Sequence, residues 1–216
     1  IYRIANQPEE AIKQYKKFFI YDVWGTLINT LSWMIVPIFM NAYFGSNAAG
    51  QYSLGLRVIQ IPMSLIGSSL SQVYLKTGVE KKNSKALYTY SIELIKKLLL
   101  YTIPLGILLI LFGKVGFSLV FGNQWAIAGV YSQILGPWAI LWFISSPLSN
   151  IYTICQKQNI SLISSALNLL ARFLALVLGK HLGSDVYCVV LFSVFSIITN
   201  GLSILFCLRI AKENDK

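Results

Sequence analysis

GQYSLGLRVIQIPMSLIG, residues Gly50–Gly67, decides the class of fold. The stretch is apolar enough to lie in a lipid bilayer, yet it contains the permanent cation Arg57, with Gln60 and Pro62 close behind. The whole chain shares this character, because 56% of its 216 residues are hydrophobic and only 12% are charged. A soluble chain carries about 25% charged residues. The composition therefore predicts an integral membrane protein, and long apolar runs without alternation favour helices over a barrel.

Six membrane-spanning helices are predicted around this stretch. Each is long enough to supply the ~20 residues that cross the hydrocarbon core. Proline and glycine inside several of them are tolerated, because neighbouring helices satisfy the freed backbone groups. The predicted spans are approximately 18–43, 49–75, 98–121, 126–153, 160–180 and 186–208. The predicted fold class is all-α, a polytopic membrane helix bundle over 18–210, with a connecting segment, 1–17, before it and a tail, 211–216, after it.

Lysine and arginine predict the orientation of these spans, because cytoplasmic loops are enriched in positive charge. Fourteen of the 18 basic residues fall in the leading segment, in the connections after the second and fourth spans, and in the tail. The opposite connections hold only Lys180. Both ends of the chain are therefore expected in the cytoplasm. The net charge of +10 is mostly a topology signal, so no nucleic-acid partner is expected.

The second span carries a continuous polar stripe within an arc of about 80°. Its members are Ser53, Arg57, Gln60, Ser64, Ser68 and Ser71. Helix packing is one interpretation, since small and polar residues let backbones approach closely. The wall of a water-filled cavity is the favoured one, because packing does not require an arginine. An unpaired arginine near the bilayer centre costs at least ~2.5–3.5 kcal/mol, and such residues usually face a bundle interior.

Weaker polar stripes occur on four other spans. They comprise Asp22, Thr26, Asn29 and Trp33 in the first span, Tyr131, Trp138, Trp142, Ser145 and Ser149 in the fourth, Ser161, Ser165, Asn168 and Arg172 in the fifth, and Ser196, Asn200 and Ser203 in the sixth. Helix packing is the simpler interpretation for the fifth and sixth spans. Arg57 and Arg172 lie at similar predicted depths, about 10 Å and about 12 Å below the outer ends of their helices. A guanidinium suits phosphate, although Arg172 could instead pack or reach lipid headgroups.

Two other features bear on the fold and on chemistry. Residues 44–53 and 121–132 share the order FG, AG and YS, which predicts two similar outer turns. Apolar residues among the lysines of 76–97 predict an amphipathic stretch on the membrane surface. The cysteines lie in or beside apolar runs and His181 stands alone, so no metal site or catalytic dyad can be assembled. We therefore expect no cofactor and no enzymatic activity.

The run NTLSWMIVPIFMNAYFGSNAAGQYSLGLRVIQIPMSLIGSSLSQVYLKTG (Asn29–Gly78) resembles the seventh and eighth helices of bacterial polysaccharide biosynthesis proteins. These are O-antigen-type lipid-linked oligosaccharide flippases of the multidrug/oligosaccharidyl-lipid/polysaccharide exporter superfamily. FGNQWAIAGVYSQILGPWAILWFISSPLSNIYTICQKQN (Phe121–Asn159) is similar to a turn and the tenth helix of the same family. Arg57, Pro62 and Gly67 meet the pattern R-x-x-x-x-P-x-x-x-x-G of the related lipid II flippases. The resemblance implies the second half of a twelve-helix-type transporter, whose first half is expected as its partner.

The resemblance also implies a function. Such a protein moves a polyprenyl-diphosphate-linked oligosaccharide, for example an O-antigen unit for lipopolysaccharide, across the bacterial cytoplasmic membrane by alternating access. Arg57 would attract the diphosphate, and Trp33 would stack on a sugar. The expected substrate-binding set is Ser53, Arg57, Gln60, Ser64, Asn29, Trp33, Asn168 and Arg172. The lipid-linked oligosaccharide and membrane lipids are the other expected partners.

Two further functions stay open from the sequence. A cation-coupled drug antiporter of the same superfamily is the main alternative, and by resemblance it would use acids embedded in the membrane. None of the eight acidic residues lies deep in a predicted span. A membrane glycan polymerase or glycosyltransferase would need a sizeable outer loop or a carboxylate site. The predicted outer loops are only a few residues long.

Overall fold

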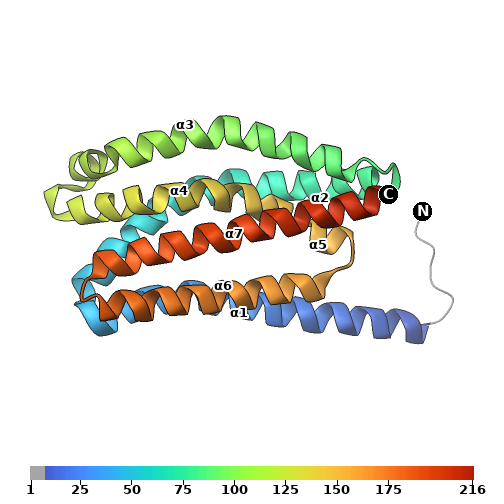
Figure 1. Ribbon diagram of the computed structural model, residues 1–216, viewed down its shortest axis with the longest axis horizontal. Coiled ribbons are helices and arrows are strands. Elements are labelled where there is room, and N and C mark those ends of the chain that lie inside the picture. The colour runs from blue at the N-terminus through green and yellow to red at the C-terminus, as the bar shows by residue number, and fades with distance from the viewer. Residues whose placement is uncertain (1–7) are drawn as a thin grey trace.

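The computed structural model describes the backbone of residues 8–216 and the side chains of residues 23–216. Helices run side by side along one long axis, and the described chain contains no strand (Figure 1), which confirms the all-α fold class. The elements are α1 (Pro8–Pro62), the π-helix η1 (Met63–Gly67), α2 (Ser68–Asn83), α3 (Leu87–Phe121), the 3₁₀ turn η2 (Asn123–Trp125), α4 (Ala126–Leu148), α5 (Ile151–Ile154), α6 (Gln158–His181) and α7 (Asp185–Asp215). Of the predicted connecting segment 1–17, residues 1–7 lie outside the described residues, and the rest forms the start of α1.

Five helical segments of the described chain are long and apolar enough to cross a membrane. The first, Val23–Asn83, is 61 residues long and contains most of α1 together with η1 and α2. Inside it two helices meet at a kink at Gly45, where φ is 86° and ψ is 170°. The chain reverses its direction at this end of the bundle (Figure 1). The multi-pass helical character is thus confirmed, while the count of six spans stays a prediction.

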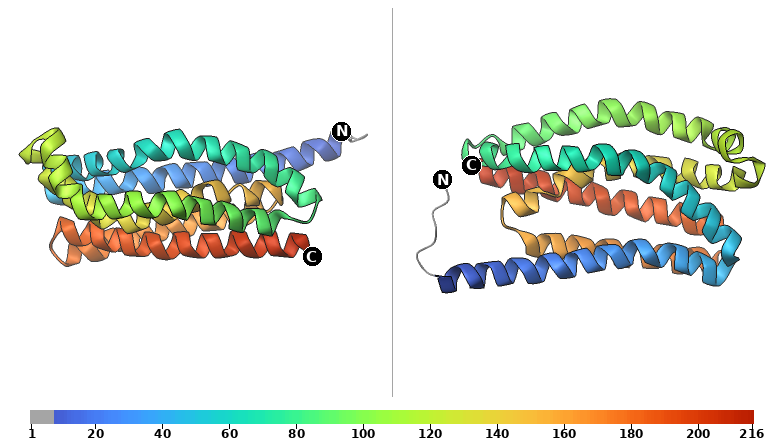
Figure 2. Two further views of the ribbon diagram at one scale, coloured as in Figure 1. Left: turned by 90° about the horizontal axis from the view of Figure 1, so that it is seen from above. Right: turned by 180° about the vertical axis from the view of Figure 1, so that it is seen from behind.

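The two turns with the shared FG order have nearly the same backbone conformation. Gly122 has φ 95° and ψ 160°, close to the values of Gly45. A positive φ costs glycine little, because it has no Cβ. Both turns lie at the end of the bundle opposite to the C-terminus (Figure 2). The buried Gln51 links them, because its Nε2 donates to the Gln124 carbonyl (2.7 Å) and its Oε1 accepts from the Ala128 amide (2.9 Å). The predicted similarity of the turns is confirmed.

The core consists of two clusters at different positions along the bundle. The cluster around Trp138 draws buried residues from α1, α4, α6 and α7. The cluster around Tyr74 and Leu148 draws its buried residues from α2, α3, α4, α5 and α7. Within the described side chains, α1 and α6 contribute no buried residue to this second cluster. The partly buried Ile160 of α6 packs against this cluster, and a cavity lies beside α1 and α6 at this end of the bundle.

No separate surface helix forms over 76–97, and the placement of this stretch on the membrane surface stays a prediction. α2 continues to Asn83, and α3 begins at Leu87, whose side chain is fully buried in the second core cluster. The end of α7 also holds this part of the chain, because Asp215 accepts hydrogen bonds from the Leu87 amide (3.1 Å) and the Tyr88 amide (2.8 Å). A carboxylate at a helix N-terminus satisfies unpaired donors and complements the helix dipole. A distant segment therefore decides where α3 starts.

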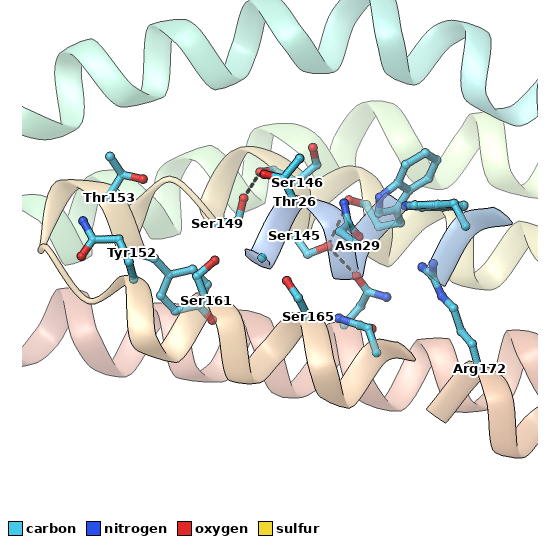
Figure 3. Close-up of a pocket in the computed structure, with 16 residues that line it drawn as sticks. Thr26, Asn29, Ser145, Ser146, Ser149, Tyr152, Thr153, Ser161, Ser165 and Arg172 are labelled. Carbon is cyan, nitrogen blue, oxygen red and sulfur yellow. Dashed lines mark hydrogen bonds between the residues drawn. The ribbon is translucent and has the colours of Figure 1, made fainter. Parts of the chain in front are cut away.

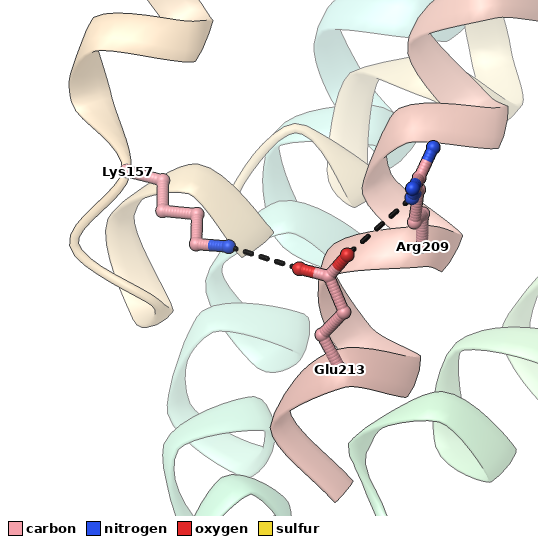
Figure 4. A network of polar contacts seen from close by, with 3 residues as sticks. All are labelled: Lys157, Arg209 and Glu213. Atoms are coloured by element: carbon pink, nitrogen blue, oxygen red, sulfur yellow. Dashed lines mark hydrogen bonds and ion pairs between the residues drawn. The ribbon is translucent and has the colours of Figure 1, made fainter. Parts of the chain in front are cut away.

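An exposed network of charges links the start of α6 to the end of α7 (Figure 4). Lys157 Nζ lies 3.3 Å from Glu213 Oε2, and Arg209 Nε lies 3.4 Å from Glu213 Oε1. The hydrogen bond and charge of Lys157, followed by those of Arg209, hold the pKa of the Glu213 carboxyl below its usual range. The network therefore stabilises the folded protein when the Glu213 carboxyl is ionised.

Acid should abolish this contribution. Because the pKa is lower in the folded protein, the carboxylate adds stability above the unfolded-state pKa of about 4.3, and this stability is lost as the pH falls through the folded-state pKa. The effect is small and sensitive to salt, since all three side chains are exposed. Thermal unfolding of Glu213→Gln beside the wild type should differ slightly at pH 7 in low salt and not at pH 3. A difference that persists at pH 3 would contradict this assignment.

Candidate functional site

A cavity of about 370 Å³ lies between α1, α4, α5, α6 and α7. Figure 3 shows Arg172 at one end of it and Tyr152 and Thr153 at the other. Its wall is polar and almost entirely uncharged, with eight hydroxyl-bearing side chains and four amides. The lining residues are Gly25, Thr26, Asn29, Trp33, Trp142, Ser145, Ser146, Ser149, Tyr152, Thr153, Gln158, Ser161, Ser165, Asn168, Arg172 and Asn200.

Arg172 is the one charged residue among those lining residues. Its side chain is only 3% exposed, and its Nη1 donates to the Ser32 hydroxyl at 2.9 Å. Its Cζ lies 4.2 Å from the centroid of the Trp33 ring and 5.3 Å from that of Phe192. The buried Nε has no hydrogen-bond partner within the described chain. An arginine has five N–H donors, so this guanidinium keeps unused capacity.

The energetics of Arg172 favour a ligand. An arginine deep in a membrane-spanning helix costs about 2.5–3.5 kcal/mol on insertion scales. The contact with Trp33 offsets about 0.5–2 kcal/mol of this cost. A buried donor without a partner costs about 1–3 kcal/mol in addition. No described carboxylate lies within ion-pair distance of the guanidinium. An anionic or strongly accepting ligand would therefore bind here favourably.

Aromatic rings form the wall next to Arg172. Trp33 and Trp142 both line the cavity, with their ring centroids 4.9 Å apart. Behind them the fully buried Trp138 stacks on Trp142 at 5.2 Å with an interplanar angle of 6°. The face of an aromatic ring is electron-rich and attracts the C–H groups of a sugar ring. The cavity thus combines a cation, aromatic faces and neutral hydrogen-bonding groups.

Four of the eight predicted substrate-binding residues meet in this cavity, namely Asn29, Trp33, Asn168 and Arg172. Asn168 is already engaged, because its Nδ2 donates to the Ser164 carbonyl (3.0 Å) and its Oδ1 accepts from the Thr199 hydroxyl (2.6 Å). It therefore joins α6 to α7 as well as lining the cavity. Asn29 is exposed to the cavity from the α1 side.

The other four predicted residues lie outside this cavity, on the polar stripe of α1 and η1. Arg57 and Ser64 are exposed, and Ser53 and Gln60 are half-buried. The opposite face of the same helix packs into the bundle through residues such as Leu56. The stripe thus points away from the core of the described chain. Its role in binding substrate stays a prediction.

Several other lining residues belong to the polar stripes of the predicted fourth, fifth and sixth spans, namely Trp142, Ser145, Ser149, Ser161, Ser165 and Asn200. From the sequence, helix packing is the simpler interpretation for those of the fifth and sixth spans. Packing is part of their role, since Ser145 donates to the Asn200 amide oxygen at 2.8 Å. Ser146, Tyr152, Thr153 and Gln158 belong to none of the predicted stripes, although they lie in the run Phe121–Asn159 that carries the family resemblance. The available signal was that the stripes of four spans could face one another.

Comparison with known proteins gives one match. The family model described as polysaccharide biosynthesis protein matches residues 3–129, more than half of the 216-residue chain. No curated protein and no solved structure matches the chain. The matched range includes the polar stripe around Arg57 and the α1 side of the cavity, whereas Arg172 lies outside it.

Proposed function

The chain belongs to the family of polysaccharide biosynthesis proteins, and from this membership we propose that it is a membrane flippase for a polyprenyl-diphosphate-linked oligosaccharide. It would move an O-antigen or other surface-polysaccharide unit across the bacterial cytoplasmic membrane by alternating access. It would leave the glycan chemically unchanged. The polar cavity with the buried Arg172 is the observation that carries this proposal.

We further propose that the chain crosses the membrane six times as one half of a twelve-helix-type transporter. The kink at Gly45 supports this count, because a 61-residue segment at 1.5 Å per residue would be about 90 Å long, far beyond the ~30 Å hydrocarbon core. The start of α1 and the end of α7 also lie at the same end of the bundle (Figure 1). The basic residues in the connections at that end support a cytoplasmic location for it.

The exposed stripe is the second part of the proposal. Arg57 and Ser64 are exposed on a helix long and apolar enough to span a membrane, and a charge facing lipid is costly. We therefore place this surface against the other half of the transporter, across a central cavity. Arg57, Gln60 and Ser53 would there bind the diphosphate of the lipid carrier, because guanidinium groups hold phosphate oxygens through charge-assisted hydrogen bonds. A cation-coupled antiporter is less well supported, because the charged residue in the cavity wall is a cation.

Arg57→Ala should reduce glycan export at least tenfold. Hydrogen bonds to a charged group contribute about 1.5–3 kcal/mol, and 1.4 kcal/mol corresponds to a factor of ten. Export is measured as surface glycan in a strain that depends on the protein, with membrane levels followed by immunoblotting. Lys114→Ala is the matched control, because Lys114 is also an exposed cation on a predicted span but lies on α3. Full export by Arg57→Ala at normal protein levels would refute the role of Arg57.

A further inference from the structure

We infer that the cavity around Arg172 selects an acidic sugar, meaning a glycan residue that carries a carboxylate. This inference rests on the proposed function and names the part of the cargo that the cavity holds. The carboxylate would accept from the guanidinium of Arg172, and the sugar rings would lie along the hydroxyl and amide groups of the wall. The membership of the family does not by itself specify the charge of the glycan.

The charge of the cavity matches a single carboxylate. One guanidinium faces a wall of neutral groups, and no described carboxylate lies within ion-pair distance of it. The planar guanidinium matches the two oxygens of a carboxylate. A diphosphate is also an anion, but it carries more than one negative charge and would meet only one cation here. The exposed Arg57, on a different surface, is the better candidate for that group.

The surroundings of Arg172 match a sugar more closely than a simple anion. Trp33 and Trp142 present aromatic faces beside the guanidinium, and Asn29 is exposed to the same cavity. The volume of about 370 Å³ falls within the range of about 300–1,000 Å³ that is typical of small-molecule sites. A free inorganic anion would use neither the aromatic faces nor the row of hydroxyl groups.

The shape of the cavity places the acidic sugar at its deep end. Along α6 the wall runs from Gln158 to Arg172, about 21 Å at 1.5 Å per residue. Arg172 is 3% exposed, whereas Thr153, at the other end and close to the turn between α5 and α6, is exposed (Figure 3). The acidic residue would therefore be held deepest, with the neighbouring sugars extending toward that turn.

Binding of free sugars to the purified protein in lipid nanodiscs tests the inference. The probes are sodium glucuronate, glucose, sodium acetate and inorganic pyrophosphate, and the readout is the fluorescence of tryptophan, checked by calorimetry. Glucuronate should bind at least tenfold more tightly than glucose or acetate. Arg172→Gln should weaken glucuronate binding at least tenfold and change glucose binding less than twofold. Lys114→Gln, which removes an exposed cation on α3, should leave glucuronate binding unchanged.

Three results would overturn the inference. Equal affinity for glucose and glucuronate would make the cavity a neutral-sugar site. Equal affinity for acetate and glucuronate, or tighter Arg172-dependent binding of pyrophosphate, would make it an anion site that does not recognise sugar. No binding of glucuronate by well-folded protein would refute the assignment outright. Arg172→Lys keeps the charge and the contact with Trp33, so it guards against a folding defect, and it should bind glucuronate with intermediate affinity.

The same experiment separates this inference from the proposed function. If glucuronate does not bind but export still depends on Arg57, the flippase proposal stands and the acidic-sugar assignment falls. If glucuronate binds as expected but neither Arg57→Ala nor Arg172→Gln alters glycan export, the cavity binds acidic sugars and the flippase proposal falls.

Discussion

Arg172→Gln should lower glycan export at least tenfold without removing the protein from the membrane. The substitution deletes the charged residue of the cavity wall and its unpaired donor, while glutamine still fills part of the space. Losing a hydrogen bond to a charged group costs about 1.5–3 kcal/mol, which corresponds to a factor of ten or more. Surface glycan per unit of membrane protein is the measurement.

Two variants show whether this loss reflects substrate handling or folding. Lys114→Gln makes the same change of charge on an exposed side chain of α3, and we expect normal export. Arg172→Lys keeps a cation near Trp33, so the packing of α6 against α1 should be preserved. It loses the planar guanidinium, which can donate two parallel hydrogen bonds to one anion. It should export better than Arg172→Gln and less well than the wild type. Normal export by Arg172→Gln would refute a role for this cation in transport.

Gly129→Ala should destabilise the bundle by about 1–3 kcal/mol or more. A Cβ at Gly129 would lie 2.6 Å from the Gly113 carbonyl oxygen and 2.6 Å from the Lys114 Cα. Both atoms belong to the backbone of α3, so they cannot move unless α3 and α4 separate. Small residues are common at such crossings because they let two helix backbones approach closely. The free energy of unfolding in mixed micelles is the measurement.

Gly116→Ala is the matched control on the neighbouring helix. It makes the same chemical change inside α3, but nothing lies within 4 Å of the added Cβ. Alanine is favoured over glycine in a helix interior by about 0.5–1 kcal/mol, so this variant should be as stable as the wild type or slightly more stable. Equal stability of the two variants would show that α3 and α4 do not meet at Gly129 as described.

The class of protein and the form of its turns could be predicted from the sequence, because both are local properties. Apolar runs of about 20 residues indicate membrane helices whatever they pack against. The FG turns at Gly45 and Gly122 were predicted to be alike, and both glycines have a positive φ. The resemblance to polysaccharide biosynthesis proteins likewise follows from residues in order along the chain, and the family match agrees with it.

The location of the cavity was decided by the tertiary structure. Periodicity shows which face of a helix is polar, but not which neighbour that face meets. The strongest stripe, around Arg57, points away from the described core, whereas four weaker stripes converge around Arg172. Among the described side chains, the buried apolar residues of α1 and α6 belong to the cluster around Trp138, and the second cluster is contacted from these two helices by the partly buried Ile160. How neighbouring helices rotate and separate depends on contacts between residues far apart in the chain, and no single stripe contains that information.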